Sequence, residues 1–371
     1  MLFGEIKALQ DSKTKLIKAI QTRHIAHAQL FWGIEGSAAL PMAMAYATYL
    51  LCENKQPNDS CGKCPACLKS QKLIHPDWHF IFPTATTKKI SSKPTSQDFM
   101  VEWRAFLQKN PYASLSHWLA HIEAEDKQGN ISVEESRNIL SKLSLKAFES
   151  PYKIMMIWLP ELMNLNAANA ILKILEEPTP QTVFLLVSHD KRKLLTTIIS
   201  RLQAVRIPQF SDKELAEILV EKYQIEVEKA QSVAFLADGN LNEALHLLEE
   251  VSINHFDLFR NWMRSCFKKD YKNLLQHTEQ FSALSKDAQK SFLLYGLHIS
   301  RETILWVEGA SPLVRLRGQE LEFVKNFSSF FPLHTAQTFS EKLNEAYYHL
   351  ERNANAKIVF LDTSLQLTRC F

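Results

Sequence analysis

In the first half of the chain, short runs of apolar residues alternate with segments whose apolar residues recur at the helical period. Residues 152–159 (YKIMMIWL) and 182–188 (TVFLLVS) are apolar almost throughout, and residues 28–32 (AQLFW) form a third run of this kind. Segments with a helical period follow, over about residues 40–51 after one run and 164–177 after another. Buried parallel strands in βα units show this pattern. We therefore predict an α/β fold built on a parallel sheet.

The chain divides into domains where the alternation of strand and helix patterns stops. The alternation covers about residues 1–208, which we expect to form one α/β domain. Residues 84–128 interrupt it with a polar stretch, expected to be mobile, and then an aromatic-bearing helical stretch, and we interpret them as an insertion. From Ser211 onward only helical periodicity is present, opened by a capping-box serine. We expect a short helical domain over residues 209–250 and a longer one over 251–371.

Composition narrows the class of protein. The chain has 371 residues, of which 46% are hydrophobic and 22% charged, as in ordinary globular proteins. A formal net charge of +3 is nearly neutral at this length, so only a local basic face would favour nucleic-acid binding. No apolar run is long enough to span a membrane, and the start lacks the apolar block of a signal peptide. We expect a cytoplasmic protein without a membrane partner.

The cysteines predict a metal site. Two of the six, Cys266 and Cys370, stand alone, and the other four cluster as Cys52, Cys61, Cys64 and Cys67. In a reducing compartment such a cluster indicates metal rather than disulfides. Turns with two residues between thiols let thiolates converge on one tetrahedral ion at about 2.3 Å, and four of them close the shell. We predict a structural zinc ion.

Two other interpretations of these residues are possible. Each CxxC pair could be a redox dithiol, but the two pairs overlap and no thioredoxin-like βαβ context surrounds them. His75 and His79 follow the cluster and could also bind metal. Because four thiols already complete a shell, we interpret both histidines as structural.

The turn after residues 28–32 has the place of a phosphate-binding loop but lacks its chemistry. A working loop reads GxxxxGK[ST], in which the lysine reaches the phosphates and the hydroxyl holds Mg²⁺. This turn begins with Gly33 and contains Gly36, and Ala38 then takes the second glycine position. Ala39 takes the lysine position and Leu40 the hydroxyl position. We expect no ATP to bind here.

Five segments in order resemble one family: RHIAHAQLFWGIEGSAAL, the CxxCxxC cluster, HPDWHFI, NAANAILKILEEPTPQTVFLLVS and LLTTIISRLQ. They look like the AAA+ subunits of the bacterial DNA polymerase III clamp loader, the family of gamma/tau and delta-prime. The resemblance spans about residues 20–206, apart from the insertion. It implies an AAA+-type α/β domain with a zinc cluster over about residues 52–67. The helical remainder fits the family's lid domain and its collar, or oligomerisation, domain by architecture only.

Departures from the ATP-hydrolysing members favour a delta-prime-like subunit. In those members an acidic pair ends the second-motif strand, and its positions fall here at Trp158 and Leu159. The arginine that lid domains carry falls at Asn242. Together with the changed loop, these replacements remove the lysine, the magnesium ligands, the catalytic carboxylate and the lid arginine.

One functional position of the family is retained, at Ser200-Arg201. The resemblance implies that Arg201 reaches a neighbouring subunit's ATP site and acts there in trans. Leu202 stands where the family usually has cysteine. From spacing alone, a surface arginine that caps the end of a helix is the favoured interpretation of Arg201, and the LEEP segment upstream favours the finger instead.

The leading hypothesis is therefore a non-hydrolysing scaffold that supplies an arginine finger. Its implied partners are the gamma/tau ATPase subunits and delta, with the sliding clamp and primer-template DNA reached through the complex. The alternatives are an active gamma/tau-like ATPase and a zinc-dependent nucleic-acid-binding module. The missing loop lysine argues against the first, and the near-neutral charge argues against the second.

Overall fold

The computed structural model describes residues 1–144, 146–249, 255–316, 318–329, 333–352 and 354–369. It divides into two compact units, Met1–Ala244 and Leu245–Phe371. The predicted boundary at residues 250/251 lies outside the described residues, as does Cys370. The division into three domains therefore stays a prediction.

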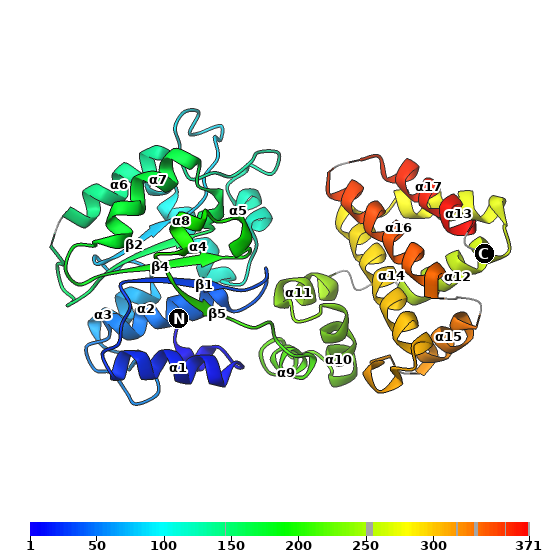
Figure 1. The fold of residues 1–371 in the computed structure, drawn as a ribbon, viewed down its shortest axis with the longest axis horizontal. Coiled ribbons are helices and arrows are strands. Elements are labelled where there is room, and N and C mark those ends of the chain that lie inside the picture. Colours follow the sequence, from blue (N-terminus) through cyan, green and yellow to red (C-terminus); the bar gives the residue numbers. More distant parts are fainter. Residues whose placement is uncertain (145, 250–254, 317, 330–332, 353, 370–371) are drawn as a thin grey trace. The chain divides into compact units, whose positions relative to one another are not determined.

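The first unit is built on a five-stranded parallel sheet with the strand order β2-β3-β4-β1-β5 (Figure 1). All three predicted strands are present, as β1 (Ala28–Trp32), β3 (Lys153–Trp158) and β4 (Thr182–Ser188). Sequence analysis missed the two edge strands, β2 (Trp78–Ile81) and β5 (Gln203–Arg206). Every residue of β3 and β4 is buried, which accounts for their unbroken apolar pattern.

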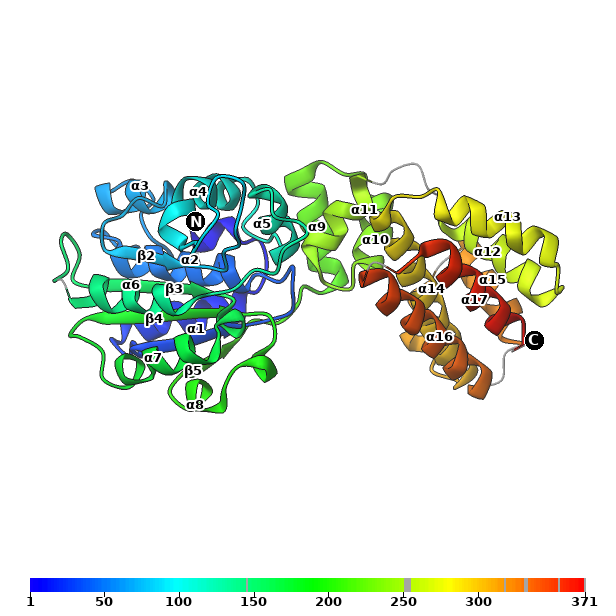
Figure 2. The same ribbon diagram turned by 90° about the horizontal axis from the view of Figure 1, so that it is seen from above.

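Helices cover both faces of this sheet (Figures 1 and 2). On one face, alternate side chains of the central strands pack against α6 (Val133–Ser144), α7 (Leu165–Glu176) and α8 (Thr196–Ile199). The other face is covered by α2 (Ala39–Leu51), which is buried along its whole length. Two further helices lie on that side, α1 (Gln10–Gln21) and α3 (Pro65–Gln71). The predicted helices 40–51 and 164–177 are thus found within one residue at each end.

The predicted insertion is helical and contributes to the core of the first unit. After a polar stretch it forms α4 (Met100–Lys109) and α5 (Leu115–His121). Trp103 of α4 and Trp118 of α5 are both fully buried, with ring centroids 5.1 Å apart. The Nε1–H of Trp118 donates to the carbonyl of Pro83 at 2.7 Å, which fixes α5 to the chain after β2.

The rest of the chain is helical, as predicted. The first unit continues with α9 (Asp212–Tyr223) and α10 (Val227–Leu236). Helix α9 begins with the predicted capping box at Ser211. The boundary between the two units falls within the next helix, α11 (Leu241–Glu249). The second unit holds α12 (His255–Phe267), α13 (Tyr271–Ser282), α14 (Lys286–Val307), α15 (Gly318–Ser328), α16 (Leu333–Glu351) and α17 (Ala356–Thr368). Aromatic side chains, among them Phe259 and Trp262, form its core. None of the described helices has the length and apolarity needed to cross a bilayer.

Candidate functional site

The degenerate loop lies at the carboxyl end of β1, the edge at which open parallel sheets bind ligands. Gly36 adopts a left-handed conformation with φ of +72°, and α2 begins shortly after it at Ala39. Ala39 and Leu40 are 1% and 4% exposed. The two positions that would hold phosphate and magnesium in a working loop are therefore apolar and buried in the first turn of α2.

The start of α11 and the residue before it pack directly on this loop. The backbone N–H of Leu241 donates to the carbonyl of Gly36 at 3.2 Å. A Cβ atom on Gly36 would lie 1.7 Å from Oδ1 of Asn240. The absence of a side chain at Gly36 is therefore what lets the start of α11 close over the loop.

Trp158 and Leu159, at the positions of the family's acidic pair, are buried at the carboxyl end of β3. The ring centroid of Trp158 lies 5.1 Å from that of Trp103 and 6.3 Å from that of Phe106, both in α4. An aromatic cluster therefore stands at the positions predicted for the acidic pair. It offers no oxygen ligand to Mg²⁺ and no base to a water molecule.

His189, which follows β4 at the same edge, contributes no positive charge. Its ring packs edge-on against Trp158, with centroids 6.3 Å apart, and its Nδ1 lies 4.0 Å from the Glu35 carboxylate. Burial lowers the pKa of His189 to about 4, so the imidazole is neutral at pH 7. This ring therefore gives a triphosphate no compensating cation.

Asn242, at the lid position, is joined to the insertion. Its Oδ1 accepts from Nδ2 of Asn110 at 3.5 Å, and its Nδ2 lies 3.3 Å from Nδ1 of His117. The same His117 nitrogen lies 2.6 Å from Oγ of Ser114. The insertion thus contacts both Trp158 and Asn242, the predicted lid position, whose side-chain amide is engaged within the chain.

Gly36→Ala is expected to destabilise the first unit by roughly 2–4 kcal/mol. The left-handed φ costs a side chain about 1–2 kcal/mol, and the clash with Asn240 adds about as much again. Combining it with Asn240→Ala, which removes the clashing amide, should give a loss smaller than the sum of the two single losses. Chemical denaturation of the four proteins measures this coupling.

Gly309→Ala is the control for backbone cost, because Gly309 has the same φ of +72° and no atom within 4 Å of its added Cβ. Gly309→Ala should lower the free energy of unfolding only by the cost of the left-handed backbone conformation. Strict additivity of Gly36→Ala and Asn240→Ala would contradict the packing of this segment on the loop.

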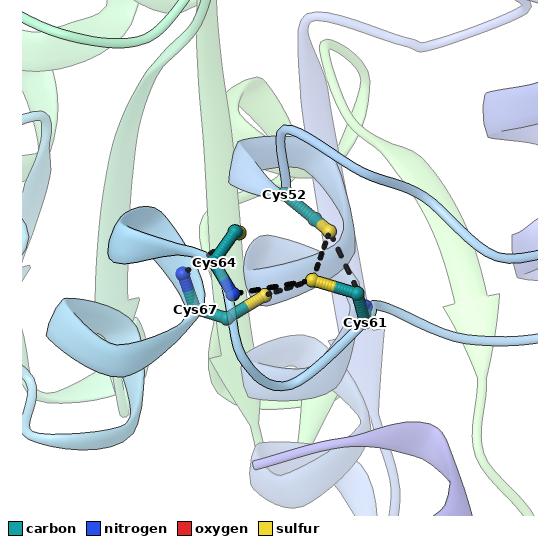
Figure 3. Close-up of side chains that lie close together, drawn as sticks. All are labelled: Cys52, Cys61, Cys64 and Cys67. Atoms are coloured by element: carbon teal, nitrogen blue, oxygen red, sulfur yellow. Dashed lines mark hydrogen bonds between the residues drawn. The ribbon is translucent and has the colours of Figure 1, made fainter.

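The four clustered cysteines come together at the end of α2 and the start of α3 (Figure 3). Their sulfur atoms all lie within 4.8 Å of one another. The Sγ of Cys61 is 3.7 Å from that of Cys52 and 3.9 Å from that of Cys67. Bonds of about 2.3 Å at tetrahedral angles place ligand sulfurs about 3.8 Å apart. The thiols therefore fit a single zinc ion, and this group of potential ligands contains neither His75 nor His79.

The surroundings of the cluster favour thiolates at some positions and oppose them at others. The N–H groups of Lys63 and Cys64 lower the pKa of Cys61 to about 6. Burial instead raises the pKa of Cys52 and of Cys67. A divalent cation would compensate the charge that burial opposes at these two thiols.

Arg201 lies at the surface just after α8, next to Ser200. Its Nε and Nη2 are 3.1 and 3.0 Å from Oε2 of Glu176, the last residue of α7. Its Nη1 donates to the carbonyl of Thr197 in α8 at 2.9 Å, and its side chain is 30% exposed. The carbonyl contact is the helix-end interaction named as the alternative for this residue. A role in a neighbour's site stays a prediction.

Comparison with known proteins decides the family. The sequence profile described as "DNA polymerase III, delta subunit" matches residues 9–211, more than half of the chain. The chain belongs to the DNA polymerase III delta-subunit family. Together with the parallel sheet and the helical remainder, this membership confirms the predicted fold class, an AAA+-type α/β domain followed by helical domains.

Individual relatives of this delta-family chain are delta', tau and gamma subunits of DNA polymerase III. "DNA polymerase III subunit delta'" of Pseudomonas aeruginosa is 30% identical over 176 residues, or 47% of this chain and 41% of the relative. "DNA polymerase III subunit tau" of Bacillus subtilis is 25% identical over 247 residues, 65% of this chain and 36% of the relative. "DNA polymerase III subunit gamma" of Buchnera aphidicola is 23% identical over 362 residues, covering 95% and 85%. The match spans about two fifths of the first two relatives.

Sequence reasoning missed three side chains that organise this delta-family chain. Asn110 and His117 hold the lid position, and Glu176 holds Arg201. Glu176 lies within the LEEP segment, so a signal for its place near Arg201 was present. Nothing in the pattern of the insertion indicated contacts with a residue more than a hundred positions away.

Proposed function

We propose that this chain is a delta-prime-like, non-hydrolysing subunit of a bacterial clamp loader. It assembles in the cytoplasm with gamma/tau ATPase subunits and delta, and the complex loads the sliding clamp of DNA polymerase III on primer-template DNA. The chain contributes a scaffold and, at Arg201, an arginine finger for a neighbouring subunit. Family membership supports the complex, and the following observations support the role within it.

One observation supports the non-hydrolysing role: the positions predicted for the acidic pair and the lid arginine carry side chains that pack within the chain. Trp158 packs against Trp103, and Asn242 pairs with Asn110. ATP with Mg²⁺ brings several negative charges, which working sites balance with a lysine, a metal held by carboxylates and a lid arginine. Without such partners, the free energy lost by burying that charge is far larger than the free energy gained from contacts with backbone N–H groups.

The second candidate is an active gamma/tau-like ATPase, favoured by the gamma relative that matches 95% of the chain. The residues argue against it. Ala39 replaces the loop lysine and Trp158 stands in place of an acid, so neither phosphate binding nor activation of water has its side chain. Sequence similarity over the whole chain reflects the shared fold, whereas ATP hydrolysis depends on the side chains at these few positions.

Zinc has a structural part in this proposal. Bound to the four cysteines, it would join the end of α2 to the start of α3. A closed four-thiolate shell leaves no position for a substrate, so the ion would supply stability and no chemistry.

Calorimetric titration of the isolated chain with ATP and Mg²⁺ is expected to show no saturable binding in the micromolar range. A gamma/tau ATPase subunit titrated under the same conditions is the positive control. The double variant Ala39→Lys, Leu40→Thr should not gain binding, because Trp158 and Asn242 remain in place. Micromolar binding of one ATP by the unmodified chain would exclude the proposal that its nucleotide site is lost.

A further inference from the structure

The second unit carries a groove between α12 and α15 that plays no part in the proposed trans action. One face of α12 and one face of α15 line it, at spacings of three and four residues that align side chains along a helix. Its volume is about 520 Å³. Pockets that bind organic ligands or peptide side chains have volumes of about 300–1,000 Å³.

The floor of the groove is apolar and mostly aromatic. Phe256, Met263 and Phe267 come from α12, and Phe323 and Phe327 come from α15. The rings of Phe323 and Phe327 stack with centroids 5.1 Å apart, and Phe267 is 48% exposed. A floor of this kind binds bulky apolar side chains through the hydrophobic effect.

The rim of the groove along α12 and the residue after it is positively charged. Arg260, Arg264 and Lys268 follow one another at intervals of four residues. Arg260 is paired with Asp257 at 2.5 Å and lies over the ring of Phe256. Among the described residues, no carboxylate pairs with Arg264 or Lys268, and both side chains are exposed. The apolar floor is therefore bordered by two cations that form no ion pair among the described residues, and Glu322 of α15 is the acidic side chain in the lining.

From this combination we infer that the groove binds a short acidic segment of another protein that carries aromatic or large aliphatic side chains. The apolar side chains enter the floor between α12 and α15, and the carboxylates face Arg264 and Lys268. An amphipathic helix or an extended peptide of this composition is a familiar occupant of such grooves. The charge on the rim selects acidic partners and speeds their encounter.

Single-stranded nucleic acid fits the groove less well. A nucleic-acid strand carries a phosphate at every nucleotide and is bound along a continuous basic track. Here Glu322 lines the same groove, and Asp257 neutralises Arg260. Two cations above an apolar floor match an acidic peptide better than a phosphate backbone.

The test selects peptides of about twelve random residues, displayed on phage, against the immobilised full chain. We expect enrichment of acidic sequences with aromatic or leucine residues. The enriched peptide, synthesised with a fluorescent label, should bind the double variant Arg264→Glu, Lys268→Glu at least about tenfold more weakly in anisotropy titrations. Lys272→Glu, an exposed charge reversal on α13 outside the groove, should bind it as the wild type does.

Equal thermal unfolding of the three proteins ensures that the comparison reports binding rather than folding. The proposal is overturned if no peptides are enriched, or if the groove variant binds the enriched peptides normally. It is also overturned if a labelled oligothymidine binds the wild type and loses its binding in the groove variant. Each outcome is independent of ATP binding, and so of the proposed function.

Discussion

Cys64→Ser is expected to lower the zinc content from one ion per chain and to destabilise the first unit by more than about 4 kcal/mol. Loss of a bound metal is among the few single changes with effects of this size, because the binding free energy is also folding free energy. In a unit of this length, such a loss corresponds to a fall of roughly 10 °C in the unfolding temperature. Elemental analysis and thermal unfolding of the purified chain measure both quantities.

The position of the cluster explains why the effect should be large. Cys52 ends α2, the helix that covers one face of the sheet, and Cys64 caps the N-terminus of α3. Opening the cluster would leave buried thiols at the junction of the two helices.

Cys266→Ser is the matched control for the zinc prediction. Cys266 is also a fully buried cysteine, but it lies in α12 of the second unit and does not belong to the cluster. Its replacement should leave the zinc content at one ion per chain. Full zinc content and full thermal stability in Cys64→Ser would contradict the assignment of the four cysteines.

Much of the fold could be predicted from apolar patterns, and the exceptions have physical reasons. The runs that became β3 and β4 are buried on both faces, so their composition alone marked them as strands. Strand β5 is an edge strand with the sequence QAVR and mostly exposed residues, and it carries no such pattern. Strand β2 has only four residues, the lower limit of a recognisable strand pattern, and His79 interrupts its apolar run.

The candidate site was predictable wherever spacing along the chain carries the chemistry. The cysteines lie within sixteen positions of one another, and the loop residues are adjacent, so both groups were found from the sequence. The filling of the site depends instead on pairs such as Trp103 with Trp158 and Asn110 with Asn242. These contacts join distant segments and require the fold itself.

Arg201→Ala is expected to slow ATP hydrolysis at one site of the assembled complex by roughly 10³- to 10⁵-fold. A guanidinium beside the transferring phosphoryl group stabilises charge that develops in the transition state, and arginine fingers contribute about this much to the rate. ATP binding should scarcely change, because such a contact acts mainly in the transition state. Arg201→Lys should rescue poorly, since an ammonium lacks the planar fork of donors.

Folding and assembly should survive the loss of Arg201. In the isolated chain its guanidinium pairs with Glu176 at a partly exposed position, where an ion pair contributes only about 0–1 kcal/mol. Glu176→Ala is therefore the matched control. It breaks the same pair but leaves the guanidinium free to reach a neighbour, so a complex containing it should hydrolyse ATP at close to the wild-type rate.

The most direct test of the trans-acting role is steady-state ATPase and clamp loading by the reconstituted complex. The comparison includes the wild type, Arg201→Ala and Glu176→Ala. Because only one ATPase site depends on Arg201, the total hydrolysis rate of the complex falls by the fraction that this site contributes. The total rate falls further if hydrolysis at one site depends on hydrolysis at the others. The account predicts a lower ATPase rate and impaired clamp loading with Arg201→Ala alone, at unchanged assembly. Unchanged hydrolysis and clamp loading with Arg201→Ala in a fully assembled complex would contradict it.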